Sequence, residues 1–99
     1  MVYNINMTTH NVYALSNSTA TKITPNGVHS GMDITIQNIN LSGYIYVGGE
    51  GVTASSYGYR IMPNHAISFE LSGEDDLYLI GENADMDAAV IKINLEQGN

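Results

Sequence analysis

The feature that most constrains this fold is a series of short strand-like blocks separated by residues that interrupt strands. The clearest blocks are rich in β-branched, aromatic and aliphatic residues, and every gap between them contains Gly, Asn, Pro, Ser or Asp. These gap residues form tight turns, whereas no window shows sustained helical periodicity with capping residues. The pattern therefore predicts an all-β protein. The clearest blocks are 44–47, 59–62, 67–71, 77–80 and 89–93.

Two blocks show how the strands should be buried. Met32, Ile34 and Ile36 alternate with polar residues, which is typical of a strand with one buried face. Residues 77–80 are apolar throughout, which indicates a strand covered on both faces. Since no helical crossover separates the blocks, we expect mainly antiparallel pairing. The predicted fold is an antiparallel β-sandwich or a jelly-roll-like barrel.

The same alternation predicts the core and the turns. Turns are expected at Pro25-Asn26-Gly27, at Pro63-Asn64 and at 72–76, and positive φ is expected among Gly48, Gly49 and Gly58. The predicted core consists of the apolar residues that fall on one parity within each block. They are Ile34, Ile36, Ile45, Val47, Ile61, Ile67, Phe69, Leu71, Leu77, Leu79, Val90 and Ile91 or Ile93.

The length of 99 residues fits one domain. We predict an N-terminal arm over residues 1–9, a single β domain over 10–95 and a C-terminal tail over 96–99. The apolar residues of the arm precede the first clear strand and need a partner surface. We therefore predict interface contacts by Val2, Tyr3, Ile5 and Met7.

The charge balance excludes several classes of partner. Three Lys and Arg residues against ten Asp and Glu residues give a net charge of −7. Binding to nucleic acid or to an anionic membrane needs clustered cations, so neither partner is expected. The chain has no Cys, which rules out disulfides, and no apolar run approaches a membrane span. Residues 1–9 also lack the basic and apolar regions of a signal peptide, which predicts a cytoplasmic product.

No residue pattern predicts catalysis, a metal or a cofactor. His10, His29 and His65 are far apart in the sequence, and the acidic groups 74–76 and 85–87 match no calcium loop. We therefore expect a protein that is not an enzyme. Tyr57 and Tyr59 stand in a loop of small residues, where core packing is less expected, and they join the predicted interface or ligand contacts.

The order of these blocks resembles a family of small virion proteins of tailed bacteriophages. That family shows the progression VYVGG…VT…GY.L.PG..I.L.L…D.LY, and the corresponding segments here span about half the chain. One departure is Asn64, which stands where Gly usually follows the proline. The matching segments are Tyr44-Ile45-Tyr46-Val47-Gly48-Gly49, Val52-Thr53, Gly58-Tyr59-Arg60-Ile61, Pro63, Ile67-Ser68-Phe69-Glu70-Leu71 and Asp76-Leu77-Tyr78.

The resemblance implies a non-enzymatic structural role in the virion. The expected function is a capsid decoration or cement protein that forms a homo-oligomer, most simply a trimer, on the major capsid protein or other virion proteins. The alternative is a tail or fibre module that binds a host-surface glycan, with Tyr57 and Tyr59 as candidate contacts. A cupin-like enzyme is a third reading, and it requires a metal.

Overall fold

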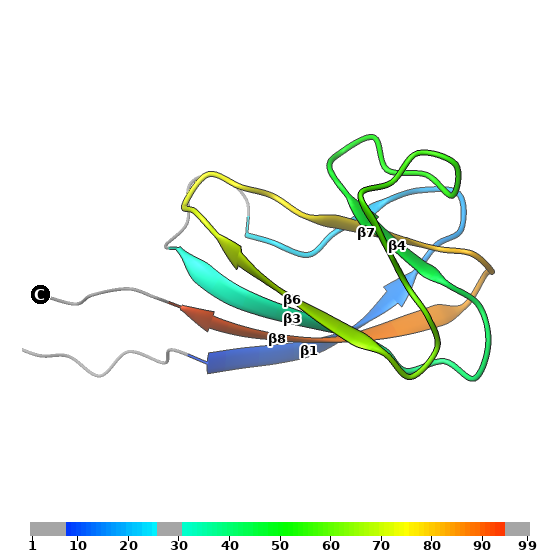
Figure 1. Cartoon of the computed structure of the whole chain (residues 1–99), viewed down its shortest axis with the longest axis horizontal. Helices are drawn as coiled ribbons and strands as arrows, with labels where there is room; N and C mark the ends of the chain where they lie inside the picture. The colour runs from blue at the N-terminus through cyan, green and yellow to red at the C-terminus, as the bar shows by residue number, and fades with distance from the viewer. Residues whose placement is uncertain (1–7, 26–30, 95–99) are drawn as a thin grey trace, which may run out of the picture.

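A computed structural model describes residues 8–25 and 31–94. The described residues contain eight strands and no helix, as Figure 1 shows. The prediction of an all-β fold is therefore confirmed. The strands are β1 (Thr8–Leu15), β2 (Thr21–Lys22), β3 (Met32–Asn38), β4 (Ile45–Gly48), β5 (Tyr59–Ile61), β6 (Ala66–Leu71), β7 (Tyr78–Gly81) and β8 (Met86–Asn94).

The eight strands form two antiparallel sheets packed as a β-sandwich. One sheet has the order β1-β8-β3-β6 and the other has the order β2-β7-β4-β5. Strands from the two halves of the chain pair in a nested series: β1 with β8, β2 with β7, β3 with β6 and β4 with β5. The first sheet is the longer layer in Figure 1, and the shorter second sheet covers only part of it.

The core lies between the sheets and follows the expected alternation in most strands. Ile34 and Ile36 on β3 are fully buried and face Ile45, Ile61 and Leu79 from the other sheet. β7 is covered on both faces, because Leu79 joins the core while Ile80 packs on the outer side of its sheet. Five buried residues of this core were not predicted, and they complete it: Leu15, Ile23, Met32, Met86 and Ala88.

The prediction for the last strand was wrong in part. Val90 is buried as expected, but Ile91 and Ile93 are 40% and 42% exposed. Ile93 pairs with Thr8 and Ile91 pairs with His10, so both side chains lie on the outer face of the first sheet. The core-facing residues of β8 are Met86, Ala88 and Val90.

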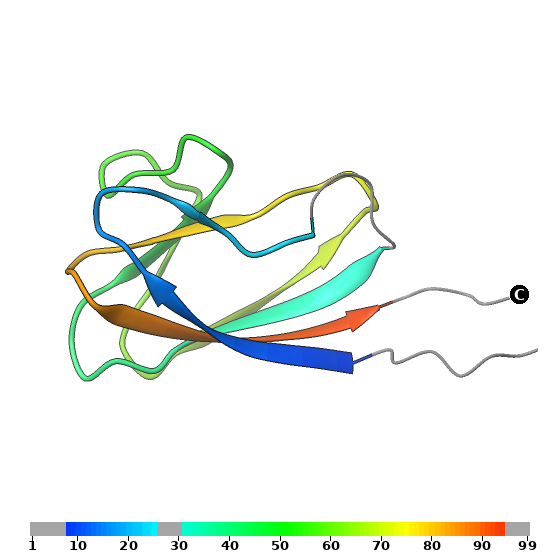
Figure 2. The same ribbon diagram turned by 180° about the vertical axis from the view of Figure 1, so that it is seen from behind.

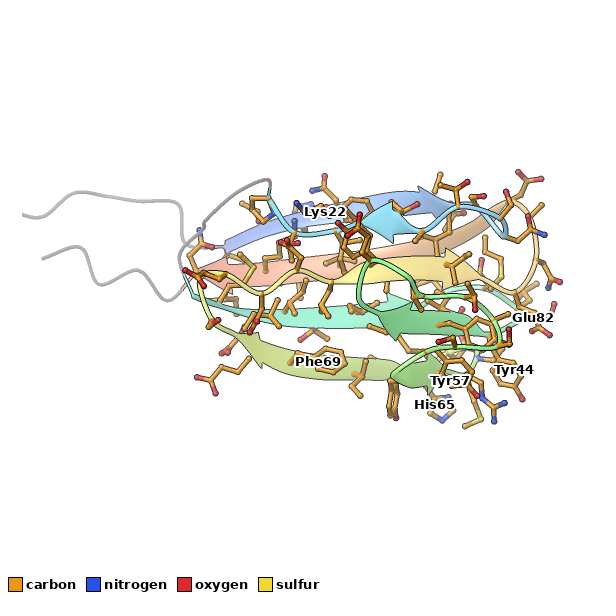
Figure 3. The ribbon with its side chains drawn as sticks, turned by 90° about the horizontal axis from the view of Figure 1, so that it is seen from above. Lys22, Tyr44, Tyr57, His65, Phe69 and Glu82 are labelled. Carbon is orange, nitrogen blue, oxygen red and sulfur yellow. The ribbon has the colours of Figure 1, made fainter. Side chains whose placement is uncertain are left out.

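Three predicted core residues are only partly buried: Ile67, Phe69 and Leu77. The reason is a mismatch in strand length at one side of the sandwich. β6 has six residues, whereas β5, the edge strand of the facing sheet, has three. Part of β6 therefore has no edge strand opposite it, and no ribbon of the second sheet passes over Phe69 in Figure 3.

The positions with positive φ also differ from the prediction. Among the described residues the left-handed positions are Gly43, Asn64 and Asp85, and not Gly48, Gly49 or Gly58. Asn64, with φ of 65°, keeps the turn after Pro63, as expected for a residue that tolerates this region. The turn predicted at Pro25-Asn26-Gly27 lies largely outside the described residues. Val52 and Thr53 form no named strand, and Thr53 makes only an isolated bridge with Ser56.

Candidate functional site

The loop between β4 and β5 folds back over the outer face of the second sheet. Val52 is buried there and packs with Tyr46 and Ile80. A Cβ atom on Gly48 would lie 3.0 Å from Val52 Cγ2, so the glycine permits this close approach. The backbone N–H of Gly58 donates to the Val47 carbonyl at 2.8 Å and returns the chain to β5. The loop is thus braced against the sheet.

Tyr57 and Tyr59, predicted as one contact surface, lie on opposite sides of this sheet. The Tyr57 ring contacts the Tyr46 ring on the outer face, with 4.8 Å between centroids. Tyr59 pairs with Val47, a core residue, so its side chain projects toward the space between the sheets. The two side chains are 43% and 45% exposed. They therefore belong to two different surfaces.

Tyr57 belongs to an outer aromatic cluster with Tyr44, Tyr46 and Arg60. The rings of Tyr44 and Tyr46 are 6.3 Å apart, and the Arg60 guanidinium lies 4.2 Å from the Tyr44 ring centroid. Glu82 accepts a hydrogen bond from the Tyr44 backbone N–H at 2.9 Å. Tyr44, Tyr57 and Glu82 gather toward one end of the molecule in Figure 3. Tyrosine and arginine are enriched at protein interfaces, so this cluster is chemically suited to contact a partner.

Burial changes the pKa of one tyrosine in this cluster, Tyr46. Desolvation raises the pKa of the Tyr46 hydroxyl above its ordinary value, and the Glu82 carboxylate raises it further. Arg60 acts in the opposite direction but does not cancel the shift. Tyr46 therefore remains a neutral hydroxyl at physiological pH and can donate or accept a hydrogen bond.

Tyr59 borders a mainly apolar hollow at the side of the sandwich, between edge strands β5 and β6. Phe69 pairs with the fully buried Ile34, so its side chain projects into the same space from the other sheet. The walls combine two aromatic rings, two aliphatic side chains, one carboxylate and a glycine-rich rim. The lining residues are Val47, Gly48, Gly49, Gly58, Tyr59, Phe69, Asp76 and Leu77.

Asp76 is held in place at this hollow by Lys22, the last residue of β2, and by Thr24, which follows β2. Its Oδ1 accepts a hydrogen bond from Thr24 Oγ1 at 2.8 Å, and its Oδ2 lies 3.6 Å from Lys22 Nζ. Thr24 Oγ1 is also within 3.4 Å of the Leu77 backbone N–H. The carboxylate position is therefore fixed by the fold.

The first sheet ends at β1, and no strand among the described residues pairs with the outer edge of β1, which is called the open edge below. β1 has eight residues without charge or proline, pairs one-to-one with β8 and lies along the border of the sheet in Figure 2. Its Val12 is 64% exposed and shares the outer face with Ile91 and Ile93. Charged residues, prolines and bulges are the usual protection of edge strands. None of them occurs in β1.

The described part of the structure does not bring the other interface candidates, the histidines or the acidic groups together in one site. Val2, Tyr3, Ile5, Met7 and His29 lie outside the described residues. Within residues 8–25 and 31–94, no group of three His, Cys, Asp or Glu side chains is arranged to hold a metal ion. Asp75 instead accepts from the Ser72 backbone N–H and hydroxyl, and His65 Nδ1 lies 3.0 Å from the Pro63 carbonyl. These side chains stabilise their own turns.

Comparison with known proteins gives little further information. No protein-family model and no curated protein matches the chain. A solved structure of Bacillus endospore appendages, described as a novel family of disulfide-linked pili, is similar with a TM-score of 0.48 and 16% identity, over 90% of this chain and 86% of that one. This distant similarity supports no functional argument. In the described part of the chain, no helix has the length and apolar character needed to cross a membrane.

Sequence reasoning missed both the outer aromatic cluster and the side hollow. The sequence predicts Tyr44 and Tyr46 as strand residues, and no local pattern places Tyr57, eleven positions after Tyr46, against the Tyr46 ring. Nothing in the sequence places Tyr59, Phe69 and Asp76 around one hollow, because that arrangement depends on how β5 and β6 end.

Proposed function

We propose that this chain is a non-enzymatic structural protein of a bacteriophage virion, and specifically a decoration or cement protein on the capsid. The resemblance of segments 44–49, 58–61 and 67–71 to small virion proteins supports this proposal. The nested strand order also supports it, because a double sheet with this pairing has the order of a jelly roll, an architecture used in viral capsids.

The observation that carries the proposal is the open edge at β1. An uncharged, regular edge strand presents backbone donors and acceptors to any second strand. Val12, Ile91 and Ile93 add an apolar strip beside it. We therefore propose that the chain works as a homo-oligomer, most simply a trimer. Repeated weak contacts would then add up to stable attachment on a symmetric shell of major capsid protein.

The chemistry of the surface is consistent with this role. Two of the acidic side chains have structural contacts: the Asp75 carboxylate accepts from the Ser72 backbone N–H, and the Asp76 carboxylate accepts from the Thr24 hydroxyl. A net charge of −7 disfavours contact with packaged nucleic acid, so we place the protein on the outside of the particle, with assembly in the host cytoplasm.

Localisation on the particle tests the proposal directly. Antibodies against the protein should label the heads of particles produced by the phage that encodes it, and light scattering should give a mass of several chains. A strict monomer that does not sediment with particles would overturn both the oligomer and the cement role.

A tail or fibre module that binds host glycan is the second candidate. The hollow bordered by Tyr59, Phe69 and Asp76 favours it, because aromatic rings beside a carboxylate suit a sugar. Antibody labelling of tails instead of heads, together with saturable binding to host polysaccharide, would support this role over the cement role.

A further inference from the structure

We propose that the side hollow between β5 and β6 binds one neutral hexose ring of a glycan. The inference deepens the second candidate function, since it assigns recognition to Tyr59 and not to Tyr57. The hollow is open to solvent at the side of the sandwich, and it shares its glycine rim, Gly48, Gly49 and Gly58, with the pocket that Tyr57 lines on the outer face.

The two rings of the hollow come from facing sheets. Tyr59 projects inward from β5, and Phe69 projects inward from β6. Because β5 is short, both rings stay partly accessible where the sheets would otherwise close over them. The apolar C–H face of a pyranose ring is removed from water when it packs on an aromatic ring, and that burial is favourable.

The rim provides space and polar partners for the hydroxyl groups. A Cβ atom on Gly49 would meet no atom within 4 Å, so the chain leaves this side of the hollow open. Asp76 is the only carboxylate among the lining residues. It already accepts from the Thr24 hydroxyl and lies beside Lys22, and each carboxylate oxygen can accept more than one hydrogen bond. A wholly apolar ligand would strip water from that carboxylate without replacing its hydrogen bonds, which is costly. A ligand with both an apolar face and hydroxyl donors fits better.

Charge selects among sugars. No residue that lines the hollow is a cation, and the nearby Lys22 lies 3.6 Å from Asp76 and so already pairs with that carboxylate. The whole chain carries a net charge of −7. A uronic or sialic acid would bring a carboxylate into a hollow that has no lining cation to pair with it, on a chain whose net charge is also negative. We therefore infer recognition of neutral hexoses and rejection of acidic ones.

The test is a nuclear magnetic resonance titration of the intact chain with neutral hexose oligosaccharides and with uronic acid oligosaccharides. Neutral sugars should perturb the amides of Tyr59, Phe69 and Leu77 as well as those of the glycine rim, and the acidic series should bind at least about tenfold more weakly. Tyr59→Ala should weaken binding by about tenfold or more, whereas Tyr59→Phe, which keeps the ring, should stay within about threefold.

Tyr57→Ala is the matched control, because Tyr57 has nearly the same exposure but lies on the other face of the sheet. It should leave affinity within about twofold. Binding lost in Tyr57→Ala and kept in Tyr59→Ala would overturn this site while leaving glycan recognition intact. If no sugar perturbs any amide, both the site and the glycan-binding function are overturned. If only a peptide or apolar probe perturbs the rim amides, the sugar assignment is overturned.

Discussion

The side-chain oxygen of Asn38 accepts two hydrogen bonds from Asn40, one from its backbone N–H at 3.1 Å and one from its Nδ2 at 2.8 Å. Asn38 is fully buried, and its own Nδ2 donates to the carbonyls of Gly43 and Ile61, both at 2.9 Å. Asn40 in turn exchanges two hydrogen bonds with the Asp87 backbone. The pair therefore ties together the segment between β3 and β4, the end of β5 and the start of β8.

Replacing Asn38 should be among the most destabilising polar substitutions in this chain. Asn38→Ala leaves the carbonyls of Gly43 and Ile61 without their donor in a buried site, and we expect a loss of about 2–4 kcal/mol in the free energy of unfolding. Urea denaturation measures the loss. Gln37→Ala, at an exposed position next to it, is the control and should stay within about 0.5 kcal/mol. Equal losses of unfolding free energy in Asn38→Ala and Gln37→Ala would show that the hydrogen bonds of Asn38 do not stabilise this end of the sandwich.

Phe69→Ala should cost less than truncation of its cross-strand partner Ile34. Phe69 is half-buried at the side hollow, so we expect a loss of about 1–3 kcal/mol. Ile34 is fully buried, and Ile34→Ala should cost about 2–5 kcal/mol. Thermal or urea unfolding of the two variants gives the comparison. A Phe69 loss larger than the Ile34 loss would contradict the register described here.

Gly43 is the glycine whose replacement should matter most among those with described geometry. Its φ is +92°, and an added Cβ would lie 2.7 Å from Asn83 Nδ2 and 3.1 Å from the Met86 side chain. Strain and clash together should make Gly43→Ala cost more than about 1 kcal/mol. Gly49→Ala meets open space without a positive φ and should change stability by less than about 0.5 kcal/mol. Similar melting temperatures for the two variants would refute this difference.

The Tyr46 hydroxyl should make the protein sensitive to alkali. Since burial raises the pKa of Tyr46 in the folded state above the unfolded value of about 10, the folded protein holds this proton to higher pH. Its contribution to stability is complete below the unfolded pKa and is lost as pH rises through the folded pKa. We therefore expect unfolding free energy to fall above about pH 10 in the wild type, and less steeply in Tyr46→Phe. Identical pH profiles would argue against a shifted pKa.

A charge placed on the open edge should reduce self-association. Val12→Lys adds a cation to β1 at an exposed position, and a symmetric strand pair would bring two such cations together. Light scattering should then give a lower mass than for the wild type. Gln37→Lys lies on the same outer face but on an inner strand, and it should leave the mass unchanged. An unchanged mass in Val12→Lys would place the oligomer contact elsewhere.

The amino-acid sequence by itself determined the all-β class and most of the strands. Strand identity depends on local features, such as the alternation around Ile34 and Ile36 and the turn residues that follow each block, and these are present in the sequence. Asn64 at the left-handed turn position is such a local feature too. The two-faced burial of Leu79 and Ile80 was also visible, because a run without polar residues has no solvent face.

Only the tertiary structure decided which face of β8 is buried and where the two tyrosines lie. Both parities of β8 carry apolar residues, so the pattern alone cannot choose between Val90 and Ile91, and pairing with β1 and β3 makes the choice. Residues two apart share a face only within one strand, and Tyr57 precedes β5 while Tyr59 begins it. The hollow at Phe69 likewise depends on the unequal lengths of β5 and β6, since a gap between edge strands is created by packing and not by any one segment.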